Sequence, residues 1–287
     1  MICERINTDV GSPVERLFRY RREFLIRNLT VGAGAAGLAT VGGEVEADPG
    51  MADDAAILNF ALNLEYLVAE YYTLAVSGVG IEQWGVNTSG ATGPPGGLIV
   101  KDDPRVRFAT PGIVAYANEA AADERAHVQF LRKALDGGMV PSVARPAIDL
   151  LDSFREVAAL AGLGAGFDPF ADEDAFLIGA FLFEDVGVAA YHGATRRLKN
   201  RAPLDAAAGI LSVEAYHAGE VRALMATRGL FDEAARITAF RESSRGGTWD
   251  RSPGDGERST NPVLETLYLR REGGGGFFPE GLNGAIR

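Results

Sequence analysis

Glu124-Arg125-Ala126-His127 places a glutamate three residues before a histidine, and Glu214-Ala215-Tyr216-His217 repeats that spacing later in the chain. Residues three apart lie on the same face of an α-helix, so one helical turn can offer a carboxylate oxygen and an imidazole nitrogen to one cation. One such pair would carry little weight, but the chain has only three histidines, and two of them stand in this arrangement. The repetition indicates a metal site built from helices.

Two further glutamates, Glu65 and Glu184, each stand alone on the apolar face of a segment with helical periodicity. Neither can be buried as an anion without a compensating cation. Each is followed seven residues later by a tyrosine, Tyr72 or Tyr191. The order Glu, Glu-x-x-His, Glu, Glu-x-x-His therefore indicates two copies of one helix pair.

Apolar residues recur at steps of three and four in four long segments and in one short one. The long segments are 53–77, 113–136, 172–199 and 203–228, and the short one lies near 153–161. Residues 78–110 are rich in glycine and proline without a period, which predicts a long loop. The pattern predicts an all-α fold: a four-helix bundle over residues 53–230 with a long crossover between its second and third helices, and an irregular C-terminal tail over residues 231–287 that packs on the bundle.

The composition is that of an acidic globular protein, because 47% of the residues are hydrophobic and the formal net charge is −11. An acidic surface repels phosphate, so we expect no nucleic-acid partner. The only cysteine is Cys3, which precedes a segment interpreted as an export signal. We therefore expect neither a disulfide nor a thiolate ligand in the mature chain, and any metal must be held by oxygen and nitrogen donors.

Residues 1–47 have the order of features expected of a twin-arginine export signal with an N-terminal extension. Arg21-Arg22 precede an apolar run at 29–43 that is rich in alanine and glycine, and Val45-Glu46-Ala47 offers a V-x-A cleavage site. The run is shorter than the roughly 17 to 25 residues needed to span a bilayer. We therefore expect a mature chain without a membrane span, located in the periplasm or outside the cell.

The set of four glutamates and two histidines resembles that of the ferritin-like di-iron carboxylate superfamily, in which two helices give one glutamate each and two give Glu-x-x-His each. Asn63-Leu64-Glu65 followed by Tyr71-Tyr72 is similar to the first helix of ferritins. The twin-arginine start, the opening Leu58-Asn59-Phe60-Ala61-Leu62 and the ending Gly276-Phe277-Phe278-Pro279 together resemble a bacterial ferritin-like family related to plant desiccation-related proteins. This resemblance covers residues 53–287 and implies a ferritin-like four-helix bundle.

The resemblance also implies a centre of two metal ions. Its ligands would be Glu65, Glu124, His127, Glu184, Glu214 and His217. Glu124 and Glu214 would bridge both ions, each histidine would bind one ion, and the two lone glutamates would be terminal ligands. Oxygen-rich ligation with imidazole suits iron or manganese, and the ligand types alone do not choose between them. We expect iron in preference to manganese.

A redox-active metal pair of this kind would react with O2 or peroxide, as a ferroxidase, a peroxidase or a catalase-like enzyme. The alternative is a non-catalytic stress or desiccation-related protein in which the metal is structural. A buried polar network without metal is less favoured, because four converging carboxylates would have strongly raised pKa values. Iron storage in a hollow cage is also less favoured, and a homo-oligomer of another kind stays open.

The remaining polar residues near these helix faces are assigned to packing or to solvent. Tyr72 and Tyr191 are interpreted as core packing in preference to hydrogen bonding with ligands. Asp123 is interpreted as a solvated helix charge, although it could orient a histidine. His192 lies off the stripe of Glu184 and is expected at the surface, or partly buried without metal. Solvated positions off the ligand faces are expected for Glu70, Glu119, Asp185 and Glu220.

Overall fold

The computed structural model describes residues 49–138 and 140–243. The export signal predicted at 1–47 and the predicted tail beyond residue 243 lie outside the described residues. The long helices of the described chain are α2 (Pro49–Ser77), α3 (Pro111–Asp136), α5 (Glu173–Thr195) and α6 (Arg201–Arg228). Its shorter elements are the 3-10 turn η1 (Ile81–Trp84), strands β1 (Leu98–Ile99) and β2 (Ile148–Asp149), and helices α4 (Asp152–Leu160) and α7 (Phe231–Ser243).

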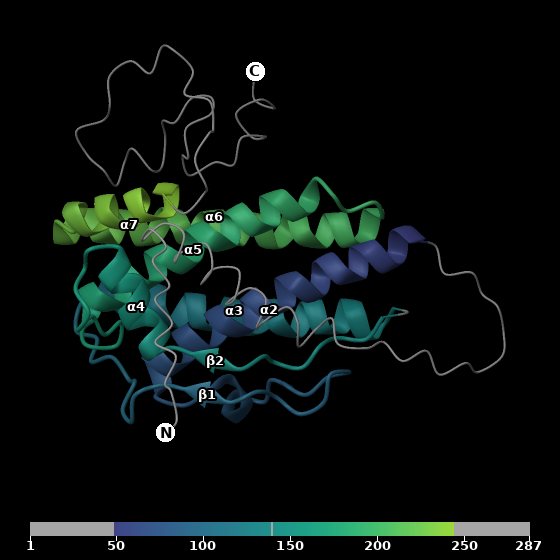
Figure 1. Cartoon of the computed structure of the whole chain (residues 1–287), viewed down its shortest axis with the longest axis horizontal. Coiled ribbons are helices and arrows are strands. Elements are labelled where there is room, and N and C mark those ends of the chain that lie inside the picture. The colour runs from purple at the N-terminus through teal and green to yellow at the C-terminus, as the bar shows by residue number, and fades with distance from the viewer. Residues whose placement is uncertain (1–48, 139, 244–287) are drawn as a thin grey trace, which may run out of the picture.

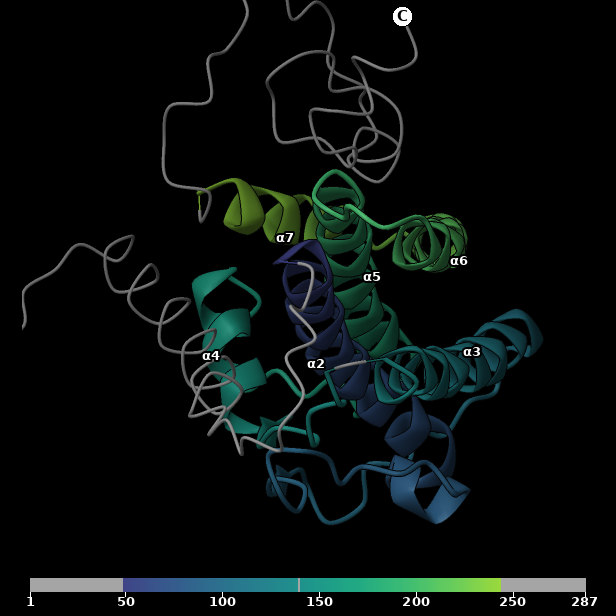
Figure 2. The same ribbon diagram turned by 90° about the vertical axis from the view of Figure 1, so that its right-hand side faces the viewer.

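The four long helices form the predicted bundle (Figure 1). Helix α2 packs along α3 and α5 packs along α6, while α3 also contacts α6 and α2 contacts α5. Seen end-on, the α5–α6 pair lies over the α2–α3 pair, and α4 and α7 lie outside the bundle (Figure 2). The chain passes from the first pair to the second through residues 137–172. The prediction of an all-α bundle with a long crossover between its second and third helices is confirmed.

The long helices begin and end at residues with recognisable capping roles. Pro111 starts α3, where its missing N–H costs no hydrogen bond. Asp172 caps α5, because its carboxylate accepts a 2.9 Å hydrogen bond from the backbone N–H of Ala175. Helix α6 ends at Arg228 and is capped by Gly229, whose φ of 73° is the left-handed conformation that glycine adopts without strain. These residues set the lengths of the helices that carry the predicted ligands.

The bundle interior is apolar and packed around aromatic side chains. Tyr71 of α2 stacks on Phe176 of α5 and meets Phe183 edge to face. Helix α5 is long and apolar enough to cross a membrane by length and composition, but 72% of its apolar window is buried inside the bundle. Burial against the other helices accounts for this composition, so α5 is a core helix of the described fold.

The two long connections, 78–110 and 137–172, pair with each other beneath α2 and α3 (Figure 1). Strand β1 in the first connection lies parallel to β2 in the second. Gly96 allows their close approach, because a side chain there would overlap the backbone of Pro146 and Ala147. The segment predicted as a loop without a period therefore contains a short strand and a 3-10 turn.

A buried ion pair anchors these connections to the bundle. Glu70 of α2 is fully buried and pairs with Arg145 of the crossover, while the backbone N–H of Ile81 donates to Glu70 at 3.1 Å. The prediction that Glu70 is solvated is wrong. Its compensating guanidinium comes from a segment far away in the sequence, so the periodicity of α2 alone does not reveal the pair.

Helix α5 ends at Thr195 rather than at Lys199 as predicted. The backbone N–H groups of Lys199 and Asn200 donate to the carboxylate of Asp54 on α2, at 2.9 and 2.8 Å. Because these donors bond to another helix, they do not continue the hydrogen-bond ladder of α5. A cap of this kind leaves no periodic signal in the segment that it ends.

Residues 231–243 form helix α7, where an irregular tail was predicted. Acidic side chains in its first turn favour a helix N-terminus. Leu230, Ala234 and Ile237 are buried and recur at steps of four and three, which gives this short helix an apolar face. The prediction is wrong for these residues, and the short apolar stripe after Gly229 was the signal for the helix.

Candidate metal centre

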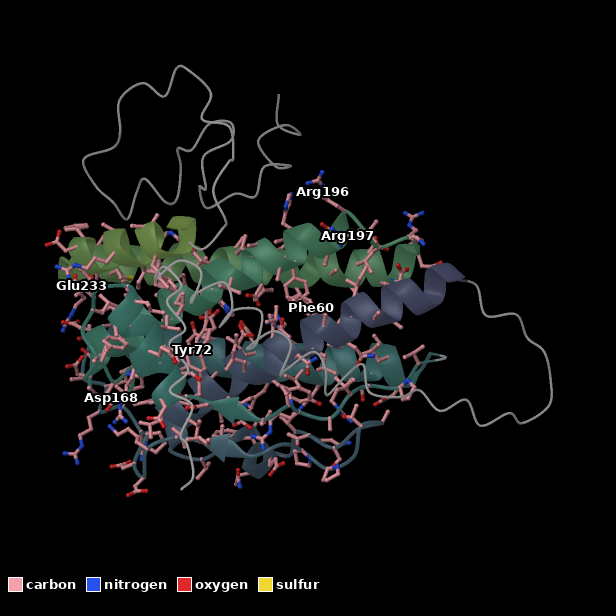
Figure 3. All side chains as sticks on the ribbon, viewed as in Figure 1. Phe60, Tyr72, Asp168, Arg196, Arg197 and Glu233 are labelled. Carbon is pink, nitrogen blue, oxygen red and sulfur yellow. The ribbon has the colours of Figure 1, made fainter. Side chains whose placement is uncertain are left out.

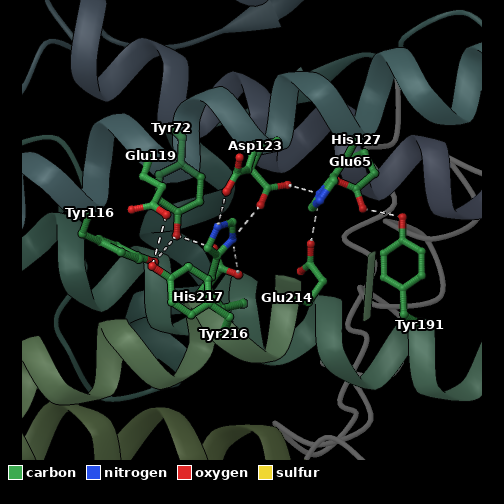
Figure 4. Close-up of polar contacts among 12 residues, drawn as sticks. Glu65, Tyr72, Tyr116, Glu119, Asp123, His127, Tyr191, Glu214, Tyr216 and His217 are labelled. Atoms are coloured by element: carbon green, nitrogen blue, oxygen red, sulfur yellow. Dashed lines mark hydrogen bonds and ion pairs between the residues drawn. The ribbon is translucent and has the colours of Figure 1, made fainter. Parts of the chain in front are cut away.

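The structure brings all six predicted ligands together in the middle of the bundle. The ligands come from all four long helices: Glu65 from α2, Glu124 and His127 from α3, Glu184 from α5, and Glu214 and His217 from α6. All six residues are buried, and none is more than 8% exposed. The polar groups form a row between the two helix pairs (Figure 4). Each helix therefore turns its predicted donors inward, as its periodicity requires.

Four of the donors surround one point, here named the His127 position: Glu65, Glu124, His127 and Glu214. The Nδ1 atom of His127 lies 3.3 Å from an oxygen of Glu65 and 3.4 Å from oxygens of Glu124 and Glu214. These four atoms make no hydrogen bond with any described residue. They face a common point without satisfying one another.

Three donors surround a second point, here named the His217 position: Glu124, Glu184 and His217. The Nδ1 atom of His217 lies 3.1 Å from Glu124 and 3.6 Å from Glu184. Glu124 thus serves both positions, with one oxygen towards each histidine. The resemblance implied that Glu214 also bridges, but in the structure Glu214 faces only the His127 position.

This geometry fits a pair of cations. Among the described residues, five buried donor atoms of the centre have no hydrogen-bond partner: Glu65 Oε2, Glu124 Oε2, His127 Nδ1, Glu184 Oε2 and Glu214 Oε1. An unsatisfied buried polar group costs about 1–3 kcal/mol, and a charged one costs more. Ligand atoms held about 2.0–2.2 Å from one cation lie about 2.8–3.6 Å from one another, which matches the N···O distances found here. Oxygen and imidazole donors in this proportion suit iron or manganese.

Burial and mutual repulsion separate the pKa values of the four glutamates. Desolvation, together with the charge of Glu124, raises the pKa of Glu65 to about 7. Desolvation and the same neighbouring charge raise the pKa of Glu214 well above its ordinary value, and desolvation also raises the pKa of Glu184. Desolvation of Glu124 is outweighed by the nearby imidazoles of His127 and His217, so its pKa is lowered. Glu124 is therefore the most acidic of the four.

The two histidines of the centre carry pKa values that are far from ordinary. Burial alone would lower the pKa of each imidazole, but the surrounding carboxylates outweigh it. They raise the pKa of His217 to about 11 and that of His127 well above its usual range. In the metal-free chain, protons on the imidazoles thus compensate the carboxylates, and a metal ion must displace them.

Two tyrosines hold the lone glutamates from behind, each across the bundle. Tyr72 of α2 donates to Glu184 of α5, and Tyr191 of α5 donates to Glu65 of α2. The hydroxyl of Tyr72 also lies 2.6 Å from that of Tyr116. Tyr72 lies inside the bundle, in contrast to the arginines labelled at its outer edge (Figure 3). Tyr72 and Tyr191 therefore do more than pack in the core, because their hydroxyls hold the two lone glutamates. The seven-residue spacing from each lone glutamate to the next tyrosine was the sequence signal for this second role.

Asp123 orients one of the two histidines. Its Oδ2 atom lies 3.2 Å from Nε2 of His217, which leaves Nδ1 to face the centre. The interpretation of Asp123 as a solvated helix charge is wrong, although its side chain is 40% exposed. The residue before Glu214 is Val213, which offers no acceptor, so His127 has no matching aspartate from the other helix.

Two further polar residues are more buried than predicted. Asp185 is fully buried in an ion pair with Arg222, so its predicted solvation is wrong. His192 is 6% exposed, lies outside both cation positions, and has a pKa lowered by burial. Glu119 is exposed and Glu220 is half-buried, in line with their predicted places off the ligand faces.

Comparison with known proteins identifies the family. Residues 53–227, which carry all six predicted ligands, match the ferritin-like domain. The chain belongs to the ferritin-like domain family. This ferritin-like protein is also 31% identical over 179 residues to the desiccation-related protein PCC13-62 of Craterostigma plantagineum. The expected ferritin-like fold and the expected likeness to a plant desiccation-related protein are confirmed.

The likeness to the plant protein is partial. It covers 61% of this ferritin-like chain and 54% of that protein, so the chain spans about half the length of the curated relative that it matches. No solved structure matches the chain significantly.

Proposed function

We propose that this ferritin-like protein binds two metal ions, iron in preference to manganese, and uses them in redox chemistry with O2 or peroxide. The observation that carries the proposal is the convergence of four buried glutamates and two buried histidines, from four helices, on two adjoining points. Without cations, this cluster leaves five polar atoms unpaired in the core. With a cation at each point, all five gain a partner.

The chain's own residues would hold the ions and shape the reaction. Glu124 offers one oxygen to each position, which fixes the separation of the two points. Tyr191 and Tyr72 hold the outer oxygens of Glu65 and Glu184, which keeps the inner oxygens directed at the centre. A reduced metal pair would supply electrons to O2 or peroxide. The surrounding apolar core limits the access of water to this chemistry.

The test is to load the purified full-length chain with Fe2+ under anaerobic conditions and then to add O2 or peroxide. Metal analysis should find about two ions per chain, as in other two-metal bundles of this architecture. The oxidant should then be consumed in proportion to the bound iron. A well-folded wild-type chain that binds neither iron nor manganese would contradict the metal assignment.

A second function is supported by the likeness to the desiccation-related protein of Craterostigma plantagineum. In this alternative, the metal staples the four helices and the chain acts as a non-catalytic stress protein. Metal binding would raise the thermal stability under both hypotheses, so stability does not separate them. Metal-loaded protein that consumes neither O2 nor peroxide would favour the stress protein.

We also propose that the chain is exported by the twin-arginine route to the periplasm or beyond. The support is the order of the arginine pair, the apolar run and the small residues within 1–47. A reporter fused to residues 1–47 should leave the cytoplasm. Replacement of Arg21 and Arg22 by lysine in the same fusion should keep the reporter inside. Retention of the unaltered fusion in the cytoplasm would contradict this proposal.

A further inference from the structure

One carboxylate oxygen of Glu214 rests against the backbone of helix α5 at Gly187. A methyl group built on Gly187 would overlap Oε2 of Glu214 and would lie 2.9 Å from its carboxyl carbon. No other residue type leaves this space, because every other side chain begins with a Cβ atom. With Oε2 placed there, the second oxygen, Oε1, lies 3.4 Å from Nδ1 of His127.

The equivalent position in the α2–α3 pair carries a side chain instead of a glycine. Gly187 stands three residues after the lone glutamate of α5, and the residue three after the lone glutamate of α2 is Val68, whose side chain is buried. Glu124 is the counterpart of Glu214 on α3, and both of its carboxylate oxygens face the centre. Its two oxygens point to the two histidines, at 3.4 Å from His127 and 3.1 Å from His217.

The two cation positions are unequal as a result. The His127 position has four protein donors, whereas the His217 position has three, because Glu214 serves only the first. Sites that hold a metal for structure tend to be closed by protein donors, whereas reactive sites keep a coordination position open for an external molecule. Of the two positions, the His217 position has fewer protein donors, so it is the one that resembles a reactive site with an open coordination position.

We propose that Gly187 is a positioning residue that lets Glu214 lean on α5, so that the His127 position binds its cation more tightly and the His217 position stays open to O2 or peroxide. This inference rests on the proposed function, because it presupposes a bound metal pair. Gly187 itself contacts neither metal nor substrate. It acts through the placement of Glu214.

The first test is a calorimetric titration of the metal-free, full-length chain with Mn2+. The wild type should show two unequal binding steps. Gly187→Ala should weaken the tighter step about 10- to 100-fold, the size expected when a metal ligand loses its support. The matched control is Gly193→Ala on the same helix, where a methyl group meets nothing within 4 Å, and it should bind Mn2+ as the wild type does.

The second test separates the two positions with azide, a small anion that occupies open coordination positions. Azide should bind to the Mn2+-loaded wild type. Azide binding should survive His127→Ala, which leaves the open position, and should be lost in His217→Ala, which removes it. The reverse pattern would overturn the assignment of the open position.

A double-variant cycle keeps the test valid if Gly187→Ala disturbs folding. Glu214→Asp shortens the side chain and withdraws its carboxylate from α5, so Gly187→Ala should then change Mn2+ affinity no more than Gly193→Ala does. Restored folding in the double variant supports the proposal, and a double variant that also fails to fold overturns it. Equal binding steps in the wild type, or an equal loss of affinity in both backgrounds, overturn it too. A wild type that binds no Mn2+ or Fe2+ contradicts the proposed function instead.

Discussion

The His127 position and the His217 position each take a histidine and a lone glutamate from one of two matching helix pairs, yet they are supported in different ways. The first is built from four direct donors. The second has three, but Asp123 stands behind its histidine, and the hydrogen-bonded pair of Tyr72 and Tyr116 stands behind its lone glutamate. A repeated helix pair therefore does not guarantee two equal sites, because residues outside the repeated pattern decide how each donor is held.

The largest effect is expected from the residue that the two positions share. Glu124→Gln keeps the size of the side chain but removes the charge that faces both histidines. We expect the affinity for Fe2+ or Mn2+ to fall by roughly 100-fold or more at both positions, since loss of an outer partner alone costs about 10- to 100-fold. Metal analysis and calorimetry measure this loss.

The control for Glu124→Gln is Glu119→Gln on the same helix, because Glu119 is exposed, lies outside both cation positions and accepts a 3.1 Å hydrogen bond from Tyr216. It should retain both ions. If Glu124→Gln also retained both ions, the two positions would not share the carboxylate of Glu124. Glu124 would then not differ from Glu214 in the number of positions that it serves.

Removal of the metal should reverse the dependence of stability on pH. In the metal-free chain the pKa of Glu65 is raised from 4.5 to about 7, so its stabilising contribution is complete below pH 4.5 and is lost as the pH rises through 7. The raised pKa values of Glu184 and Glu214 act in the same direction. His217, raised from 6.5 to about 11, loses its contribution as the pH rises between these values.

We therefore expect the metal-free chain to lose on the order of 3 kcal/mol of unfolding free energy between about pH 5 and pH 8. The metal-loaded chain should gain stability over the same range, because fewer protons compete for the donor atoms. Denaturant unfolding with and without a chelator, at both pH values, measures the difference. Parallel pH profiles for the two forms would show that the cluster does not bind metal.

A smaller and more local effect is expected at Asp123. Asp123→Asn keeps the shape but weakens the hydrogen bond that holds the ring of His217. The affinity of the His217 position should fall about 10-fold, while the affinity of the His127 position stays unchanged. A Mn2+ titration would resolve the two steps. An equal fall in both steps would mean that Asp123 acts through its charge on the whole centre rather than through one ring.

The smallest effect is expected from the two tyrosines. Tyr72→Phe and Tyr191→Phe each remove a hydroxyl and keep the ring in the core. Each should lower the unfolding free energy of the metal-free chain by about 1 kcal/mol, and Tyr72→Phe should cost more, because it also leaves Tyr116 without its partner. Equal losses in the two variants would show that the hydrogen bond between Tyr72 and Tyr116 does not help to support the His217 position.

Sequence reasoning was most successful where the signal was local. The i, i+3 spacing of Glu124 and His127 lies within one helical turn, so it predicts a shared face without knowledge of any other segment. The polar residues that were misassigned, Glu70, Asp123 and Asp185, all have partners on another element of the fold. Their spacing along their own helices is that of ordinary surface charges, so no local pattern could reveal the contacts.

The order of amino acids alone was enough to predict the four long helices, their grouping into two similar pairs and the six donors that point inward, because these properties follow from a period that each segment carries by itself. The packed fold was needed to show that Glu124 faces both positions while Glu214 faces one. That difference depends on the gap at Gly187, where two helices approach each other. Such a gap exists only where two helix surfaces are in contact, and the sequence of one helix describes only one of these surfaces.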